Sequence, residues 1–211
     1  MIDFHGESTH RYGAGYYAYH FNVPGSLGKK TTEFTYDMGL EIVVNFTHVW
    51  NGSLLGYCQS QGKIGLAAEV CDFFGLEGDP INLQPKRTAM EAGVTCVKNV
   101  LKKQGMINGQ LKLPKRQMVL DGYVGIAPAH GGLLCPEVTR NDIGRVFQKD
   151  QHLGTVINPY TFELLDKLQM PYEKTVILEV KDAVPFSHIE PGASDVGFGV
   201  GDGGTISWRT H

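Results

Sequence analysis

Hydrophobic residues in the first half of the chain form short runs separated by segments with helical spacing. Four runs that are apolar, aromatic or β-branched predict strands: Met1–Phe4, Tyr16–Phe21, Leu40–Val44 and Ile64–Val70. Pro24-Gly25 and Gly28 predict a loop, and helices are predicted over 31–38, 53–61 (capped by Asn51) and 86–104. This alternation of strands and helices is typical of an α/β fold with a partly parallel sheet covered by helices.

The segment 86–104 has the clearest helical pattern in the chain. Its apolar residues recur at steps of 4, 3 and 4, which predicts one apolar face: Met90, Val94, Val97 and Leu101. Lysines occupy the polar side and the last turns, where positive charge suits the helix dipole. Gly105 is predicted to end the helix.

The pattern changes near Leu113-Pro114. Beyond this point there is no convincing amphipathic helix longer than two turns, and short apolar runs alternate with Gly, Pro, Asn and Asp. Residues 114–211 therefore predict a small all-β barrel or sandwich module, preceded by an α/β domain over 1–113. Much of the glycine, 27 of 211 residues, lies in turns between these runs.

Composition and charge exclude several classes of protein. The net charge of −3 offers no basic excess to bind a phosphate backbone, so no nucleic-acid partner is expected. Neither a long apolar stretch nor a signal peptide is present, so we expect no membrane partner. The four cysteines form no C-x-x-C motif and are interpreted as reduced thiols of a cytoplasmic protein.

Two places in the sequence carry candidate chemistry. Asp3 and His5 lie two residues apart on one strand, so both face the same way, and the carboxylate could orient a metal-binding imidazole. The alternative is a surface histidine at a strand end. Glu69 follows small apolar residues, and burial there would raise its pKa toward that of a general base. The alternative is a glutamate paired with a neighbouring Lys or Arg.

Several segments, taken in order, resemble one family. Ile2–Glu7 resembles the (I/V)D(L/F)HGG segment of the succinylglutamate desuccinylase/aspartoacylase family, which is related in fold to zinc carboxypeptidases. The small-residue strand before Glu69 and the helical segment Ala92–Met106 follow in the family's order. Ala127–Pro136 and the segments after it resemble the family's β-module, which is related to the lipoyl-type barrel. The resemblance covers nearly the whole chain.

The resemblance implies a zinc-dependent deacylase that cleaves the amide of a small N-acylated amino acid or a related compound. On this basis His5 corresponds to the family's third zinc ligand and Asp3 to the acidic residue beside it. Glu69 corresponds to the carboxylate that assists the zinc-bound water. Zinc would polarise the carbonyl and lower the pKa of its water.

The first two zinc ligands of the family come from an H-x-x-E motif upstream of the D-x-H strand. Only Met1 and Ile2 precede that strand here, so we expect the ligands from a missing upstream segment and no activity from the chain alone. The chain would then be a fragment or half of a split enzyme, completed by a complementary chain or a homo-oligomer. Glu7 and His10 could instead complete a degenerate site. The alternative function is a non-catalytic binding or assembly module.

Overall fold

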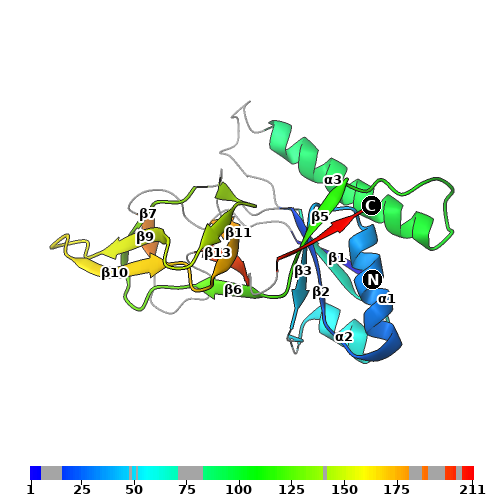
Figure 1. Cartoon of the computed structure of the whole chain (residues 1–211), viewed down its shortest axis with the longest axis horizontal. Coiled ribbons are helices and arrows are strands. Elements are labelled where there is room, and N and C mark those ends of the chain that lie inside the picture. Colours follow the sequence, from blue (N-terminus) through cyan, green and yellow to red (C-terminus); the bar gives the residue numbers. More distant parts are fainter. Residues whose placement is uncertain are drawn as a thin grey trace. The chain divides into compact units, whose positions relative to one another are not determined.

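The computed structural model divides the chain into two units, and each is described by itself (Figure 1). The first unit contains Met1–Gly6, Tyr16–Gly122 and Ile206–His211, and the second contains Glu7–Gly15 and Tyr123–Thr205. The structure describes residues 1–5, 16–47, 49–50, 52–70, 83–139, 142–180, 187–189, 198–202 and 206–211.

The first unit is built on a six-stranded mixed sheet with the strand order β1-β4-β2-β3-β5-β14. Strands β1 and β4 are parallel, β4 is antiparallel to β2, and β2, β3 and β5 are parallel to one another. The strand bounds are β1 Ile2–His5, β2 Tyr17–Phe21, β3 Ile42–Phe46, β4 Leu66–Glu69, β5 Arg116–Leu120 and β14 Ser207–Thr210. The helices are α1 Gly25–Asp37, α2 Leu54–Ser60 and α3 Leu83–Lys103. This mixed sheet with few helices agrees with the predicted α/β class.

Helices α1 and α3 begin before their predicted starts, and α2 begins where predicted but with a different cap. Helix α1 starts at Gly25, directly after an extended Pro24, where the sequence predicts a loop. Gly28 lies within this helix, and the position requires glycine because a Cβ there would lie 1.7 Å from the carbonyl oxygen of Val23. Helix α2 is capped by Ser53, whose hydroxyl accepts a hydrogen bond from the Gly56 amide at 3.0 Å. Asn51, the predicted cap, lies outside the described residues.

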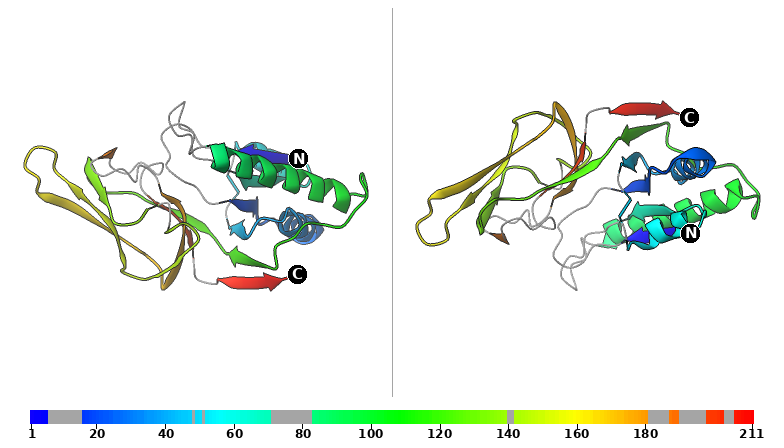
Figure 2. Two further views of the ribbon diagram at one scale, coloured as in Figure 1. Left: turned by 90° about the horizontal axis from the view of Figure 1, so that it is seen from above. Right: turned by 90° about the horizontal axis from the view of Figure 1, so that it is seen from below.

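The two faces of this sheet carry different side chains because residues alternate along each strand. Ala18, Val43 and Leu66 pack with Phe34 and Met38 of the α1 region and with Cys96 of α3. Helices α1 and α3 lie together on this face, which we call the helix face (Figures 1 and 2). The opposite face, called the aromatic face, carries four buried rings: Tyr17, Tyr19, Phe21 and Phe46.

Helix α3 is rotated relative to the prediction. The residues of its predicted apolar face are largely exposed, with Met90 at 70%, Val94 at 48% and Val97 at 36%. Its buried side instead carries small or polar residues such as Cys96 and Asn99. Small side chains let the helix approach the sheet closely, and the Asn99 side chain binds the backbone of residues 38 and 112. The sequence pattern identified the helix correctly but its buried face wrongly.

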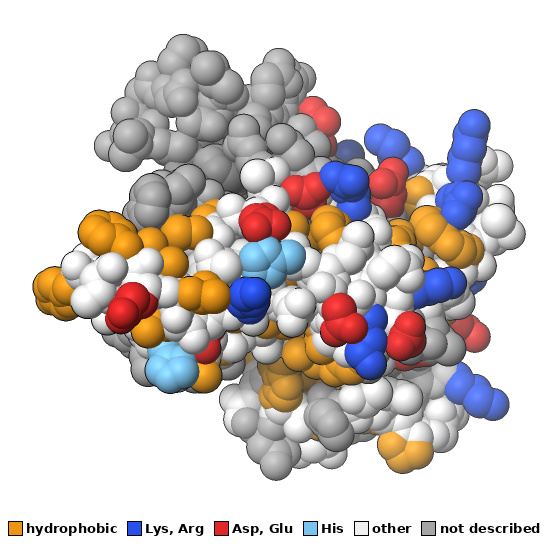
Figure 3. Space-filling view, turned by 60° about the vertical axis from the view of Figure 1, so that its left-hand side comes forward, with side chains coloured by type: hydrophobic (Ala, Val, Ile, Leu, Met, Phe, Trp, Pro, Cys, Tyr) orange, Lys and Arg blue, Asp and Glu red, His pale blue; other side chains and the backbone are white. Residues whose placement is uncertain are grey.

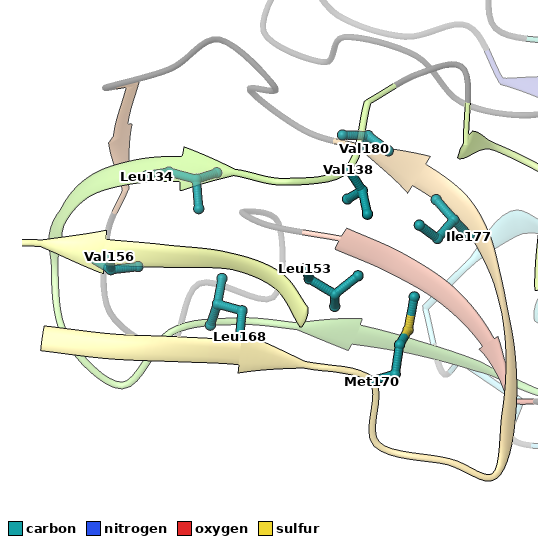
Figure 4. Close-up of a cluster of buried hydrophobic side chains, with 8 residues drawn as sticks. All are labelled: Leu134, Val138, Leu153, Val156, Leu168, Met170, Ile177 and Val180. Carbon is teal, nitrogen blue, oxygen red and sulfur yellow. The ribbon is translucent and has the colours of Figure 1, made fainter. Parts of the chain in front are cut away.

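The second unit contains two four-stranded antiparallel sheets, β10-β9-β7-β12 and β6-β13-β11-β8. Side chains from β7, β9, β10 and β11, and from residues just after β7 and β10, converge on one cluster (Figure 4): Leu134, Val138, Leu153, Val156, Leu168, Met170, Ile177 and Val180. The bounds are β6 Tyr123–Ile126, β7 Gly132–Pro136, β8 Val146–Gln148, β9 His152–Ile157, β10 Leu164–Gln169, β11 Lys174–Val180, β12 Ser187–Ile189 and β13 Phe198–Asp202.

The structure divides the chain at a different place from the sequence pattern. The pattern separates 1–113 from 114–211, whereas the first unit continues to Gly122 and includes the C-terminal residues. The reason is strand pairing: β5 lies between β3 and β14 in the first sheet. An apolar run such as Met118–Leu120 predicts a strand without showing which sheet that strand joins.

Acidic and basic side chains are interspersed over the face shown in Figure 3. Among the described helices, none combines the length and the apolar character that crossing a membrane requires. Cys58, Cys96 and Cys135 carry free thiols.

Candidate active site

The first unit brings together all three residues that the sequence singles out. Strands β1 and β4 are parallel neighbours, and their register pairs His5 directly with Glu69 at their carboxyl ends. Asp3 lies two residues before His5 and therefore on the same face of β1. Three side chains from two adjacent strands thus converge at one edge of the sheet.

The His5 imidazole lies between the two carboxylates. Its Nδ1 atom is 3.0 Å from Oε1 of Glu69, and its Nε2 atom is 3.2 Å from Oδ2 of Asp3. The side chain of Glu69 is 10% exposed, whereas that of His5 is 44% exposed. Glu69 is therefore a buried carboxylate in contact with a histidine that is partly exposed to solvent.

These contacts raise the pKa of His5 from 6.5 to about 9. The hydrogen bond to Glu69 contributes most, burial opposes it, and the charges of Glu69 and Asp3 add to the increase. Without a metal, the imidazole is therefore held protonated between two acceptors.

Tyr19 is a fourth member of the site that the sequence motifs do not identify. Its hydroxyl is 3.3 Å from Nδ1 of His5, and the two rings meet edge to face at 6.0 Å between centroids. The sequence does show that Tyr17 and Tyr19 are two residues apart on one strand, so both rings lie on one face of the sheet. Only the antiparallel pairing of β2 with β4 shows that this face is the one with Glu69.

The arrangement fits one metal-binding histidine, His5, whose ring is held by a neighbouring carboxylate, Asp3. Asp3 lies at Nε2 of His5, so Nδ1, beside Glu69, is the ring nitrogen that could bind a metal. The described residues contain no group of three or more His, Cys, Asp or Glu side chains arranged to hold a metal ion. Glu7 and His10, which the sequence offers as further ligands, lie outside the described residues.

Two further histidine–carboxylate pairs lie in the second unit and differ from this site. His130 Nδ1 is 2.9 Å from Asp166, and His152 Nδ1 is 2.8 Å from Glu137. The His130 side chain is 61% exposed and that of Glu137 is 60% exposed. In each of these pairs one side chain is about 60% exposed. In the His5–Glu69 pair neither side chain is that exposed, and the carboxylate of Glu69 is buried at a strand end.

Comparison with known proteins identifies the fold. No protein-family model and no curated protein matches the sequence. Among solved structures, a succinylglutamate desuccinylase/aspartoacylase from Rhodobacter sphaeroides matches with 16% identity and a TM-score of 0.72. The apo structure of the ectoine utilization protein EutE (DoeB) from Ruegeria pomeroyi matches with 16% identity and a TM-score of 0.73.

The two matches cover most of this chain and only part of the known structures. Each covers 95% of this chain, which spans 57% of the Rhodobacter sphaeroides chain and 59% of the Ruegeria pomeroyi chain. Similarity at this level of identity concerns the fold, and it confirms the resemblance that the motifs indicated. The chain therefore has the fold of the succinylglutamate desuccinylase/aspartoacylase family.

Proposed function

We propose that this chain carries part of the active site of a zinc-dependent deacylase that hydrolyses the amide of a small N-acylated amino acid or a related compound. One observation carries the proposal: Asp3, His5 and Glu69 converge at the ends of two parallel strands. The fold that surrounds them is shared with structures described as desuccinylases and aspartoacylases.

The contacts support a separate role for each side chain. His5 would hold zinc through Nδ1, while Asp3 accepts the hydrogen bond from Nε2–H and fixes the ring. Zinc, when bound, supplies a polarised carbonyl and a more acidic water. Glu69, whose Oε1 lies 3.0 Å from Nδ1, would accept a proton from the attacking water and pass it to the leaving amine nitrogen.

The ligand set requires a contribution from outside the described residues. A catalytic zinc site uses three protein ligands and one open position, and the described residues contain no group of three side chains that could hold the metal. The other two ligands would come from a further polypeptide segment. On this proposal the 211-residue chain has no deacylase activity by itself.

The second unit would be the family's β-module. Two antiparallel sheets around a shared apolar cluster support a small barrel or sandwich of the lipoyl-related type. Its role in this proposal is not catalytic, because the candidate catalytic residues lie in the first unit.

The experiment compares the chain alone with the chain plus a complementing polypeptide. The complement is the part of the Rhodobacter sphaeroides protein that has no counterpart in this chain, produced separately. Zinc content and hydrolysis of a panel of N-acyl amino acids are then measured for each sample. We expect bound zinc and turnover only in the complemented sample, and full activity of the chain alone would overturn the missing-ligand argument. A stable complex without zinc or turnover would favour a binding or assembly module.

A further inference from the structure

A hollow on the first unit lies between α3 and the segment that follows this helix. Residues 104–115 leave the end of α3 and return past the helix to β5 (Figures 1 and 2). The hollow between them has a volume of about 350 Å³, and neither His5 nor Glu69 lines it. We call it the α3 hollow and define it by five of its lining residues: Met90, Val94, Lys98, Lys102 and Lys112.

Buried hydrogen bonds fix the two walls of the α3 hollow. The buried side chain of Asn99 donates to the Lys112 carbonyl and accepts from the Lys112 amide, both at 2.9 Å. The Lys112 carbonyl also lies close to the connection between α1 and β3, since a Cβ on Gly39 would be 2.6 Å from it. The fold therefore holds the segment opposite α3 in place, and the hollow is formed before any ligand binds.

Three lysine side chains line the basic end of the hollow. Lys98 and Lys102 are one helical turn apart on α3, where two like charges disfavour each other. The Lys102 Nζ atom donates to the Gln110 carbonyl at 2.6 Å, which holds this ammonium group at the hollow. Within the described ranges, no carboxylate forms an ion pair with Lys98 or Lys112. An anion bound among the three lysines would therefore relieve a repulsion that the fold leaves in place.

The helix dipole explains only part of this concentration of charge. From Ala92 to Leu120 the sequence has six Lys or Arg residues and no Asp or Glu, in a chain whose net charge is −3. Lysines in the last turns of α3 suit the negative end of its dipole. Lys112, however, lies on a different segment, and Asn99 fixes its backbone beside the helix. The three lysines thus converge through the tertiary structure and not through the helix alone.

The other end of the hollow is apolar. Four residues follow one another at steps of four and form one row on α3, with about 6 Å between neighbours along the helix axis: Met90, Val94, Lys98 and Lys102. Met90 is 70% exposed and Val94 is 48% exposed. The row therefore presents an apolar half followed by a basic half, which suits a ligand with a short apolar body and one negatively charged group.

Two glutamates determine which way such a ligand lies. Glu91 also lines the α3 hollow, and together with Glu41 it lines an adjoining hollow of about 300 Å³. Lys112 lines both hollows and so marks the boundary between them. An anionic group would be repelled on the glutamate side and attracted on the lysine side. The charged end of the ligand therefore belongs among the three lysines.

We propose that the α3 hollow binds a small carboxylate with a short aliphatic body. The carboxylate accepts hydrogen bonds from the three ammonium groups, and the aliphatic body covers Met90 and Val94. The volume of the hollow is near the lower end of the range for small-molecule sites, which suits a ligand of this size. Binding at this hollow depends on none of the residues of the candidate active site.

The test uses hexanoate as the probe. The metal-free chain is titrated with it at low ionic strength, and amide chemical shifts locate the site and give the affinity. We expect saturable shifts centred on residues 90–102 and 110–113, and weaker binding at higher salt, because salt screens the lysine charges. Hexanamide has the same body without the charge, and acetate has the charge without the body. Each should bind about tenfold more weakly than hexanoate.

Variants separate the contributions of the two ends. Combining Lys98→Gln with Lys112→Gln removes two charges at exposed positions and should weaken hexanoate binding about tenfold. Val94→Thr keeps the shape of the side chain but replaces a methyl group with a hydroxyl group. It should weaken hexanoate binding about threefold and leave acetate binding unchanged. The control Lys63→Gln removes an exposed lysine of the same unit that does not line the hollow, and it should leave the affinity unchanged.

Several results would overturn the proposal. Binding of hexanamide or acetate as tight as that of hexanoate would do so, because one end of the hollow would then contribute nothing. Equal affinity of the double variant and the control would do so as well, and so would the absence of saturable shifts or shifts centred on other residues. Amide spectra of the unliganded variants check the fold. Lys112→Gln alone, expected to weaken binding about threefold, replaces the double variant if the latter does not fold.

Discussion

The two faces of the six-stranded sheet each hold a histidine, and the two residues have opposite properties. His5, on the aromatic face at the end of β1, lies between Asp3 and Glu69, and its pKa is raised to about 9. His20, on the helix face in β2, is 1% exposed, and burial lowers its pKa to about 4. The sheet is the same, so the difference comes from carboxylates on one side and from desolvation on the other.

His20 shows what a structural histidine looks like in this fold. Its Nε2 atom is 2.9 Å from the hydroxyl of Thr32 on α1, and its Nδ1 atom has no hydrogen-bond partner among the described residues. It is neutral at pH 7 and contributes packing. His5 combines partial exposure with two carboxylates and a strand end, and this combination distinguishes a candidate site from a buried polar residue.

The largest expected effect comes from removing the carboxylate of Glu69. In the complemented enzyme, Glu69→Gln keeps the size of the side chain but cannot take up the water proton, so turnover should fall about 10²- to 10⁴-fold. The matched control is Asp166→Asn, which alters the carboxylate beside His130 in the second unit. Steady-state kinetics of both variants in the complemented enzyme check this prediction. If Glu69→Gln turned over as fast as the unmodified complemented enzyme, the catalytic role of Glu69 would be refuted.

The next effect is a loss of stability in acid that depends on His20. Its pKa falls from 6.5 in the unfolded chain to about 4 in the folded one, so the unfolded chain binds the extra proton first. The contribution of neutral His20 to the free energy of unfolding is fully present above pH 6.5. About 3 kcal/mol of it is lost as the pH decreases toward 4. Urea unfolding at several pH values should show this loss in the chain and a smaller one in His20→Gln.

In the same experiment His5 should change the pH dependence of stability in the opposite direction. Its folded pKa is raised, so its contribution to stability is present below pH 6.5 and is lost as the pH increases through about 9. Partial exposure makes this contribution smaller than that of His20. If His20→Gln and His5→Gln changed the pH dependence in the same direction, the contrast between the two faces would be wrong.

A third prediction concerns Asn99, which joins α3 to the helix face. Its side-chain amide donates to the carbonyls of Met38 and Lys112, and its carbonyl accepts from the Lys112 amide. Asn99→Ala leaves these backbone groups without a partner, and we expect a loss of about 2 kcal/mol in the free energy of unfolding. Val94→Ala, on the exposed side of α3, is the control and should change the free energy of unfolding by less than about 0.5 kcal/mol.

Asn99 also explains why the sequence predicted α3 but not its orientation. Periodicity detects apolar positions, and it selected the row that contains Met90 and Val94. The buried row contains Cys96 and Asn99, whose burial depends on close approach and on backbone groups distant in sequence. Hydrophobic spacing therefore fails where a helix packs through small and hydrogen-bonded side chains.

The candidate site was predictable to the extent that it follows from short motifs. Asp3 and His5 share a strand, Glu69 follows a run of small apolar residues, and the family resemblance added the role of each. Tyr19 could not be found in this way, because its contact with His5 depends on β2 running antiparallel to β4. The same limitation placed β5 in the wrong domain, since strand pairing is not encoded in the run of residues that forms the strand.

The smallest predicted effect tests whether Tyr19 positions the ring of His5. Its hydroxyl is 3.3 Å from Nδ1, the atom proposed to hold zinc, so Tyr19→Phe should weaken zinc binding by the complemented chain about tenfold or less. Titration with a zinc indicator measures the affinity, and urea unfolding of the metal-free chain detects any structural effect. The control is Tyr57→Phe, a ring that is 63% exposed on α2. If Tyr19→Phe lowered stability and left the zinc affinity unchanged, Tyr19 would belong to the aromatic packing of the sheet, as Phe46 does, and the site would consist of Asp3, His5 and Glu69.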